Sequence, residues 1–136
     1  MKISKSIFAL SLLIALTVSC VNKKADSSDI KLVTADEMKQ IIELEDVQVV
    51  DVRTASEFEA IHVKSAQNID FNSPTFDKDI QKLDKSKPVV LYCKGGGRSA
   101  KCAKKLKDAG FEKIYDLEGG LSKWEHSKIL NIEKKS

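Results

Sequence analysis

The 136-residue sequence has few prolines (two), few cysteines (three), few aromatic residues (6%) and no large excess of either charge. Three cysteines are too few for the disulfide framework that holds a very small secreted domain together. Lys and Arg number 23 against 20 Asp and Glu, which excludes the strong basic bias typical of nucleic-acid binding. The length suits one domain of about 100–150 residues. These absences predict one globular domain that does not bind nucleic acid.

The longest hydrophobic run lies at the N-terminus, over residues 7–18, and follows Lys2 and Lys5. It is too short to cross a bilayer as a helix, which needs about 20 residues. A basic start, a short apolar stretch and a boundary of small residues indicate a secretion signal over residues 1–19. The boundary at Cys20 resembles a bacterial lipoprotein signal. The resemblance implies a lipid on the Cys20 thiol, which would anchor an exported protein to a membrane of the cell envelope, facing the periplasm.

The chain then divides into three further segments. Residues 20–29 are polar and have no apolar period, so we expect the lipidated cysteine to be followed by a flexible tether. Residues 30–126 are expected to form the folded domain. Residues 127–136 are interpreted as a polar C-terminal extension, and His126 is expected on the surface.

Within residues 30–126, short β-branched runs alternate with segments that have helical periodicity. Thr34 followed by Glu37 is typical of a capping box, the pattern that begins a helix. The alternation predicts an α/β fold with a small parallel sheet flanked by helices on both faces. Strands are expected over residues 30–33, 47–52, 66–69, 89–92 and 113–117, and helices over 34–43, 54–59, 76–83, 98–109 and 121–126.

The segment after the strand at 89–92 indicates a chemical site, because ligands bind at the carboxyl ends of parallel strands. Cys93 comes directly after this strand, three glycines follow one residue later, and the next helix then begins. Consecutive glycines let backbone N–H groups turn inward to form an anion-binding concavity, and the helix N-terminus adds further N–H groups. Such surroundings lower a thiol pKa from about 8.5 toward 3.5–7.5. Cys93 is therefore predicted to be a thiolate nucleophile in an anion cradle formed by Lys94, Gly95, Gly96, Gly97, Arg98 and Ser99.

Two alternatives for the cysteines stay open at this point. Cys93 could be a buried structural thiol, although such a residue does not need three glycines beside it. Cys102 lies on the apolar face of the following helix and is interpreted as a core residue. A Cys93–Cys102 disulfide is the other possibility.

Several motifs together resemble those of single-domain rhodanese-like proteins, which implies a rhodanese-like fold. The motifs are Val49–Arg53, Leu91–Ser99, and Leu117–Leu121 followed by Trp124. The resemblance implies that Cys93 takes the outer sulfur from a small anionic donor such as thiosulfate and becomes a persulfide. A thiol or cyanide would then accept the sulfur, so that the reaction proceeds in two covalent steps. No cofactor and no metal are implied.

The resemblance also assigns supporting residues and alternatives. Asp51 and Arg53 would brace the loops by ion pairing, and His62 corresponds to a structural histidine of the family. Only four residues separate Cys93 from Arg98, whereas related phosphatases have five, which disfavours phosphatase and arsenate reductase activity. Ile61, Lys64 and Ser65 replace the usual Gly, Pro and Gly beside the histidine, so we expect that loop to differ in shape. The alternative function is a non-catalytic binding or sulfur-carrier module for a partner protein in the cell envelope.

Overall fold

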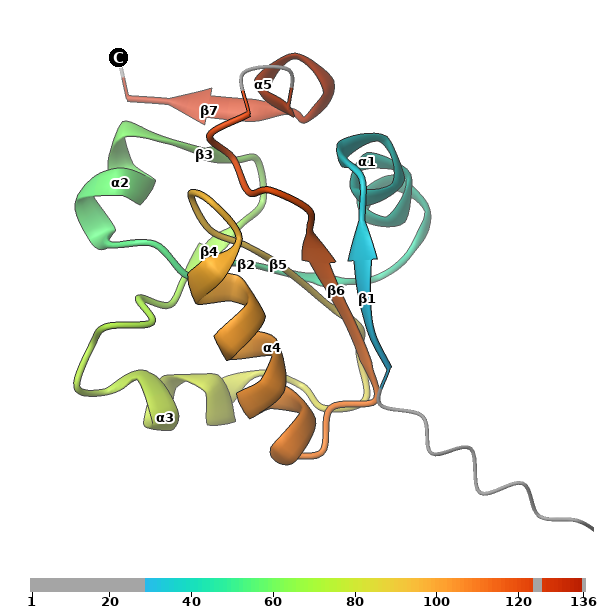
Figure 1. The fold of residues 1–136 in the computed structure, drawn as a ribbon, viewed down its shortest axis with the longest axis vertical. Coiled ribbons are helices and arrows are strands. Elements are labelled where there is room, and N and C mark those ends of the chain that lie inside the picture. Colours follow the sequence, from blue (N-terminus) through green and yellow to red (C-terminus); the bar gives the residue numbers. More distant parts are fainter. Residues whose placement is uncertain (1–28, 124–125, 136) are drawn as a thin grey trace, which may run out of the picture.

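The computed structural model describes residues 29–123 and 126–135 (Figure 1). The predicted signal peptide, Cys20 and Trp124 lie outside the described residues. Among the residues that are described, no helix is long and apolar enough to cross a membrane.

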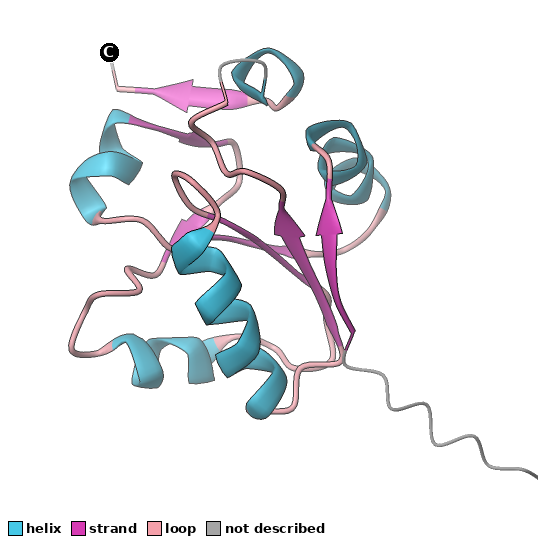
Figure 2. Ribbon diagram, in the orientation of Figure 1, coloured by secondary structure: helices cyan, strands magenta, loops and turns pink. Residues whose placement is uncertain are grey.

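A five-stranded sheet in which every pairing is parallel forms the centre of the domain (Figure 2). The strand order is β1-β6-β5-β2-β4. The bounds are Asp29–Val33 for β1, Gln48–Asp51 for β2, Gln67–Asn68 for β4, Val89–Tyr92 for β5 and Lys113–Leu117 for β6. All five expected strands are present, although the strand expected over residues 66–69 is only two residues long.

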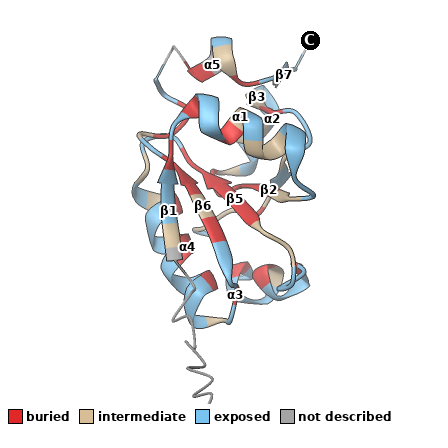
Figure 3. Ribbon diagram, turned by 90° about the vertical axis from the view of Figure 1, so that its right-hand side faces the viewer, coloured by how far each residue is buried: buried red, intermediate tan, exposed pale blue. Residues whose placement is uncertain are grey.

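Helices cover both faces of this sheet, as predicted (Figures 1 and 3). Every residue of β5 is buried: Val89 and Leu91 pack on one face, and Val90 and Tyr92 pack on the other. The first face is covered by α3 (Phe76–Asp79), the 3-10 helix Ile80–Lys82 and α4 (Gly97–Asp108), and the second by α1 (Ala35–Leu44) and α5 (His126–Ile129). Because β5 is buried on both sides, the residue that follows it is held between two packed layers.

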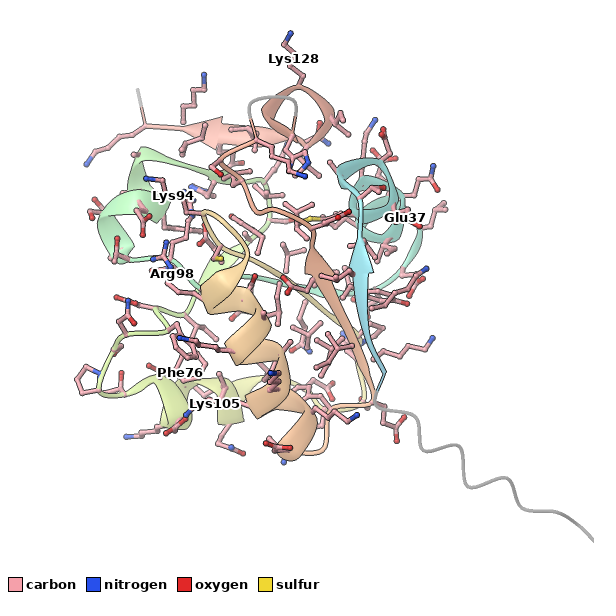
Figure 4. All side chains as sticks on the ribbon, in the orientation of Figure 1. Glu37, Phe76, Lys94, Arg98, Lys105 and Lys128 are labelled. Atoms are coloured by element: carbon pink, nitrogen blue, oxygen red, sulfur yellow. The ribbon has the colours of Figure 1, made fainter. Side chains whose placement is uncertain are left out.

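Local sequence signals begin and connect the helices. The predicted capping box of α1 is present, since Thr34 and Glu37 exchange side-chain to backbone hydrogen bonds. Thr54 and Glu57 form a second capping box at the start of α2 (Ala55–Ala60). The Lys105 ammonium of α4 lies 5.6 Å from the ring centroid of Phe76 in α3, which joins the two helices on one face (Figure 4).

The C-terminal segment differs from the expected polar extension. Strand β7 (Ile132–Lys134) pairs antiparallel with β3 (Ile61–Val63), a strand too short to be evident from periodicity. Leu130 is 3% exposed and packs in the core cluster that contains Val63. The expectation for residues 127–136 was wrong because the apolar positions 129, 130 and 132 are too few to show a period, yet they pack against the domain.

Two further expectations for this region were wrong. Residues 121–123 form a turn and a bend rather than helix, and α5 spans His126–Ile129. The part of that expected helix at residues 124–125 lies outside the described residues. His126 is buried rather than on the surface, and its Nδ1 lies 2.8 Å from the carbonyl oxygen of Gly120. A buried imidazole needs such a partner, and this contact joins α5 to the turn that precedes it. Ser65 adopts a positive φ of 68°, at a position where the resemblance noted above implies glycine.

Candidate active site

Cys93 lies directly after β5, and the chain turns through residues 94–96 before α4 begins at Gly97. Lys94 and Arg98 lie on the side of this loop that faces α2 (Figure 4). The strand, loop and helix therefore have the predicted order, with the helix beginning one residue earlier than expected. Lys94, Gly95 and Gly97 are exposed, whereas Cys93 and Ser99 are buried.

The Cys93 sulfur is surrounded by hydrogen-bond donors of its own loop. The Gly96 N–H donates to Sγ over 3.0 Å, and Sγ lies 3.5 Å from Ser99 Oγ. Burial raises the pKa of Cys93. Hydrogen bonds from the Ser99 hydroxyl and from the backbone N–H groups of Ser99, Gly96 and Gly95 lower it, and together they outweigh burial, so that the net pKa is below that of an ordinary thiol. The loop therefore favours a sulfur anion although the residue is only 1% exposed.

Of the three glycines, Gly96 is the one whose backbone requires glycine. It is the N-cap of α4 and adopts a φ of 98°, in the left-handed region where side chains are unfavourable. Gly95 and Gly97 do not have positive φ, and a Cβ on either would meet nothing within 4 Å. The left-handed turn at Gly96 directs its own N–H toward the Cys93 sulfur.

A second segment, residues 119–122, fixes the other side of the loop. The Leu121 N–H donates to the Cys93 carbonyl over 2.8 Å, and the Ser122 N–H donates to the Lys94 carbonyl over 2.9 Å. Sequence reasoning did not indicate this contact. A Cβ at Gly120 would lie 2.7 Å from the Cys93 carbonyl oxygen and closer still to that of Lys94.

Gly120→Ala is expected to destabilise the protein by about 2–4 kcal/mol, because it combines a left-handed backbone with overpacking against a fixed loop. Gly120 has a φ of 65°. Gly119→Ala is the matched control: its φ is 72°, but its new methyl would meet only the movable end of the Lys123 side chain. Its expected cost is about 1–2 kcal/mol. Urea denaturation measures both, and equal losses for the two variants would contradict the close contact with the Cys93 loop.

Asp51 and Arg53, the expected supporting residues, form a buried ion pair beside the loop. The Arg53 guanidinium donates to both carboxylate oxygens of Asp51, with Nη2 to Oδ2 at 2.6 Å, and also to the Ile61 carbonyl. It lies 5.6 Å from the ring centroid of Tyr92, the residue before Cys93. The pair therefore connects β2, β3 and β5.

Arg98 is held by Glu57, a partner that sequence reasoning missed. Its two terminal nitrogens donate to the two carboxylate oxygens over 2.8 Å and 3.1 Å. Glu57 also accepts from Thr54 in the capping box of α2. The guanidinium thus connects α4 to α2 while it lies at the edge of the predicted anion cradle.

The Arg98–Glu57 pair is expected to give a measurable pH dependence of stability. The hydrogen bond from Arg98 lowers the pKa of Glu57 from 4.5 to about 2 in the folded protein. Because the folded pKa is depressed, the unfolded chain takes up a proton first, so the stabilisation is complete above pH 4.5 and is lost as pH falls through about 2. Glu57→Gln should show a shallower loss of stability over this interval than the wild type. The same change at the exposed Glu112 is the control; equal slopes for Glu57→Gln and the wild type would count against the ion pair.

A cavity of about 320 Å³ lies beside the loop. It is lined by Arg53, Glu57, Ala60, Ile61, Lys94, Leu121 and Ser122. Two cationic side chains and one carboxylate therefore line the cavity, and Lys94 is the neighbour of the buried Cys93 in the chain. Another cavity, of about 150 Å³, lies between α1 and the loop after β3, and its lining does not include the Cys93 loop.

The two described cysteines are both free. Cys102 lies on the buried face of α4 and packs in the core, which agrees with the prediction, and burial raises its pKa to about 12. The hypothesis of a Cys93–Cys102 disulfide is therefore not supported. Among the described residues, no group of three or more His, Cys, Asp or Glu side chains could hold a metal ion.

Comparison with known proteins gives a consistent family match. Residues 34–127 match the model of the rhodanese-like domain. A thiosulfate sulfurtransferase GlpE of Shewanella oneidensis is 32% identical over 97 residues, which are 71% of this chain and 94% of that protein. A crystal structure of a rhodanese-like domain protein from Staphylococcus aureus has a TM-score of 0.66 at 31% identity and covers 79% of this chain and 100% of that one.

Other relatives are longer than this chain or have different names. An uncharacterized protein YqhL of Bacillus subtilis is 40% identical over 77 residues, which are 57% of this chain and 60% of that protein. A tRNA uridine(34) hydroxylase of Pelagibacter ubique is 33% identical over 121 residues, which are 88% of this chain but only 37% of that protein. The chain therefore covers most of the GlpE relative but little more than a third of the tRNA uridine(34) hydroxylase.

Proposed function

Since the chain belongs to the rhodanese-like domain family, we propose that it is a sulfurtransferase that carries a sulfane sulfur on Cys93. The observation that carries the proposal is the set of N–H and hydroxyl donors around the Cys93 sulfur, which lower its pKa despite burial. A thiolate is the nucleophilic form of cysteine. The same donors suit a persulfide, because its charge lies on sulfur within the same loop.

The reaction has two steps: sulfur passes from the donor to Cys93, and then from Cys93 to the acceptor. The Cys93 thiolate attacks the outer sulfur of a donor such as thiosulfate, a new S–S bond forms, and sulfite leaves with the electron pair of the broken S–S bond. A thiol or cyanide acceptor then attacks the outer sulfur of the persulfide, and Cys93 leaves as a thiolate. Each step transfers one sulfur atom, so the kinetics should be ping-pong.

The cavity beside the loop suits a small anionic donor. Lys94 and Arg53 border it, and Lys94 is exposed. Seven Lys and Arg residues against two acidic ones over residues 94–113 add to the positive potential. Arg98 is already paired with Glu57, so Lys94 is the cation best placed to meet the donor as it enters.

We further propose that the protein is exported and anchored to a membrane of the cell envelope through a lipid on Cys20. The support is the sequence of residues 1–20: two lysines, a short apolar run and a cysteine at the boundary. Mass spectrometry of the protein from its native membrane should find a mature N-terminus at Cys20 with acyl chains attached. A chain that retains residues 1–19 without a lipid would contradict this proposal.

Intact mass after incubation with thiosulfate tests the sulfurtransferase activity. We expect a gain of one sulfur atom, located on Cys93 by peptide mapping and removed by cyanide or a thiol. A protein that takes up no sulfur from thiosulfate or from an organic persulfide would contradict the proposal. If such a protein still bound a partner in the envelope, the alternative of a non-catalytic module would be correct.

A further inference from the structure

The position of β1 determines where the chain from the proposed lipid anchor enters the folded domain. The described part of the chain begins with Asp29, which is the first residue of β1. Every pairing of the five-stranded sheet is parallel, so all five strands begin at one edge of the sheet and end at the opposite edge (Figure 1). The chain therefore enters the domain at the edge where the strands begin.

Cys93 lies at the opposite edge of the sheet. Asp29 pairs with Lys113, the first residue of β6. The next residue of β6, Ile114, pairs with Val89 of β5. Cys93 comes four residues after Val89 and therefore lies five positions beyond Asp29 along the strand direction. At about 3.3 Å per residue, the two positions are separated by roughly 17 Å along the strands.

The cavity beside the Cys93 loop belongs to the same edge as Cys93. Arg53, Lys94 and Ser122 line it, and each of them follows the end of a strand, β2, β5 and β6 respectively. The loop and its cavity are thus on the side of the domain that is remote from the point of entry.

The segment between the proposed anchor and β1 is short compared with the domain. Cys20 and Asp29 are nine residues apart in the sequence, so their separation is at most about 32 Å. A folded chain of about 100 residues has a radius of gyration of about 13 Å, which corresponds to a sphere roughly 34 Å across. To place the Cys93 edge against a membrane, this segment would have to run fully extended along the whole height of the domain. Such a restriction of the backbone is entropically unfavourable.

We propose that the domain lies on the membrane with the edge where the strands begin toward the lipid and the Cys93 loop toward the aqueous phase. This inference rests on the proposed lipid at Cys20. The sulfur acceptor is then a water-soluble thiol, because a thiol held at the bilayer surface would lie on the far side of the domain from Cys93.

Energy transfer to the membrane from the two ends of one strand tests the orientation. Lys113 begins β6 and Glu118 directly follows it, and both are exposed. Lys113→Cys and Glu118→Cys, each in a Cys93→Ser background, give a matched pair of labelling sites, since Cys102 is buried. The full-length acylated proteins are labelled with a donor dye and reconstituted in phosphatidylcholine vesicles that carry an acceptor dye on the lipid headgroups.

We expect several-fold more energy transfer from position 113 than from position 118, because the second label lies roughly 17 Å further from the lipid. Inserting about 30 Gly and Ser residues before β1 should remove the difference, since the domain can then turn freely. Equal transfer from the two positions with the natural tether, or more transfer from position 118, would overturn the orientation.

Sulfur transfer in the same vesicles tests the class of acceptor. A phospholipid with a thiol headgroup should accept little sulfur from the wild type, whereas a short-chain, water-soluble form of that lipid should accept it. Equal transfer to both would contradict the proposal. The energy transfer needs no activity, so a protein that has the expected orientation but passes sulfur to neither thiol would contradict the sulfurtransferase activity alone. A chain without acyl groups on Cys20 by mass spectrometry would overturn the anchor and the orientation together.

Discussion

Replacing Cys93 by serine is expected to lower the rate of sulfur transfer from thiosulfate to cyanide by more than about 10³-fold. The serine hydroxyl would occupy the same place among the donors of the loop, but it is not ionised at neutral pH and cannot form a persulfide. Steady-state assays of purified protein measure the loss. The unfolding midpoint should change little, because serine is smaller and fits the same position.

Cys102→Ala is the matched control for this experiment. Cys102 is fully buried in the core, where burial keeps its thiol protonated. The variant should lose some stability through a small cavity while its turnover stays within the same order of magnitude as that of the wild type. A Cys93→Ser protein that retains more than about a tenth of wild-type turnover would contradict the assignment of the nucleophile.

Arg53→Met is expected to cost about 3–5 kcal/mol of stability, because it leaves the fully buried Asp51 carboxylate without its cation. The variant also removes the hydrogen bond to the Ile61 carbonyl. Urea denaturation with a shared m-value measures the cost. Sulfur transfer should fall as well, since Arg53 lines the cavity beside Cys93.

The double variant Asp51→Asn with Arg53→Met provides the control for charge. The asparagine still accepts the backbone N–H of residue 53, which Asp51 Oδ1 accepts over 2.9 Å in the wild type. We therefore expect the double variant to be more stable than Arg53→Met alone, because no buried charge remains unpaired. If the free energy of unfolding of Arg53→Met lay within about 1 kcal/mol of the wild-type value, the ion pair would not be what holds these strands together.

The parts of the structure that were predictable from sequence are those encoded over a few residues. The capping box at Thr34, the buried strand before Cys93 and the glycine loop that leads into the next helix depend on neighbours in the chain, so their patterns were visible. The strand β3 was not, since three residues show no period and its partner β7 lies about 70 positions later.

In the candidate site, too, local features were predictable from the sequence and long-range contacts were not. The Cys93 loop was evident, but the contacts that fix it come from elsewhere: Glu57 is 41 residues from Arg98, and Leu121 reaches the Cys93 carbonyl from the turn after β6. Asp116 in β6 is 1% exposed, yet nothing local in the sequence distinguishes it from a surface carboxylate. Its burial is a consequence of the sheet order, which places β6 next to β5.

The order of the strands also has a consequence for biosynthesis. Within the described part of the chain, β1 pairs only with β6, and β3, which supplies the Ile61 carbonyl to Arg53, pairs with β7. A chain emerging from the ribosome therefore cannot pair β1 with β6, or β3 with β7, until residues 113–134 have been synthesised. Until then, the first strand and the segment that contacts Arg53 lack their partners. The nascent chain should stay accessible to chaperones and proteases until late in translation. The contact between β3 and Arg53, beside the Cys93 loop, should be among the last parts to form.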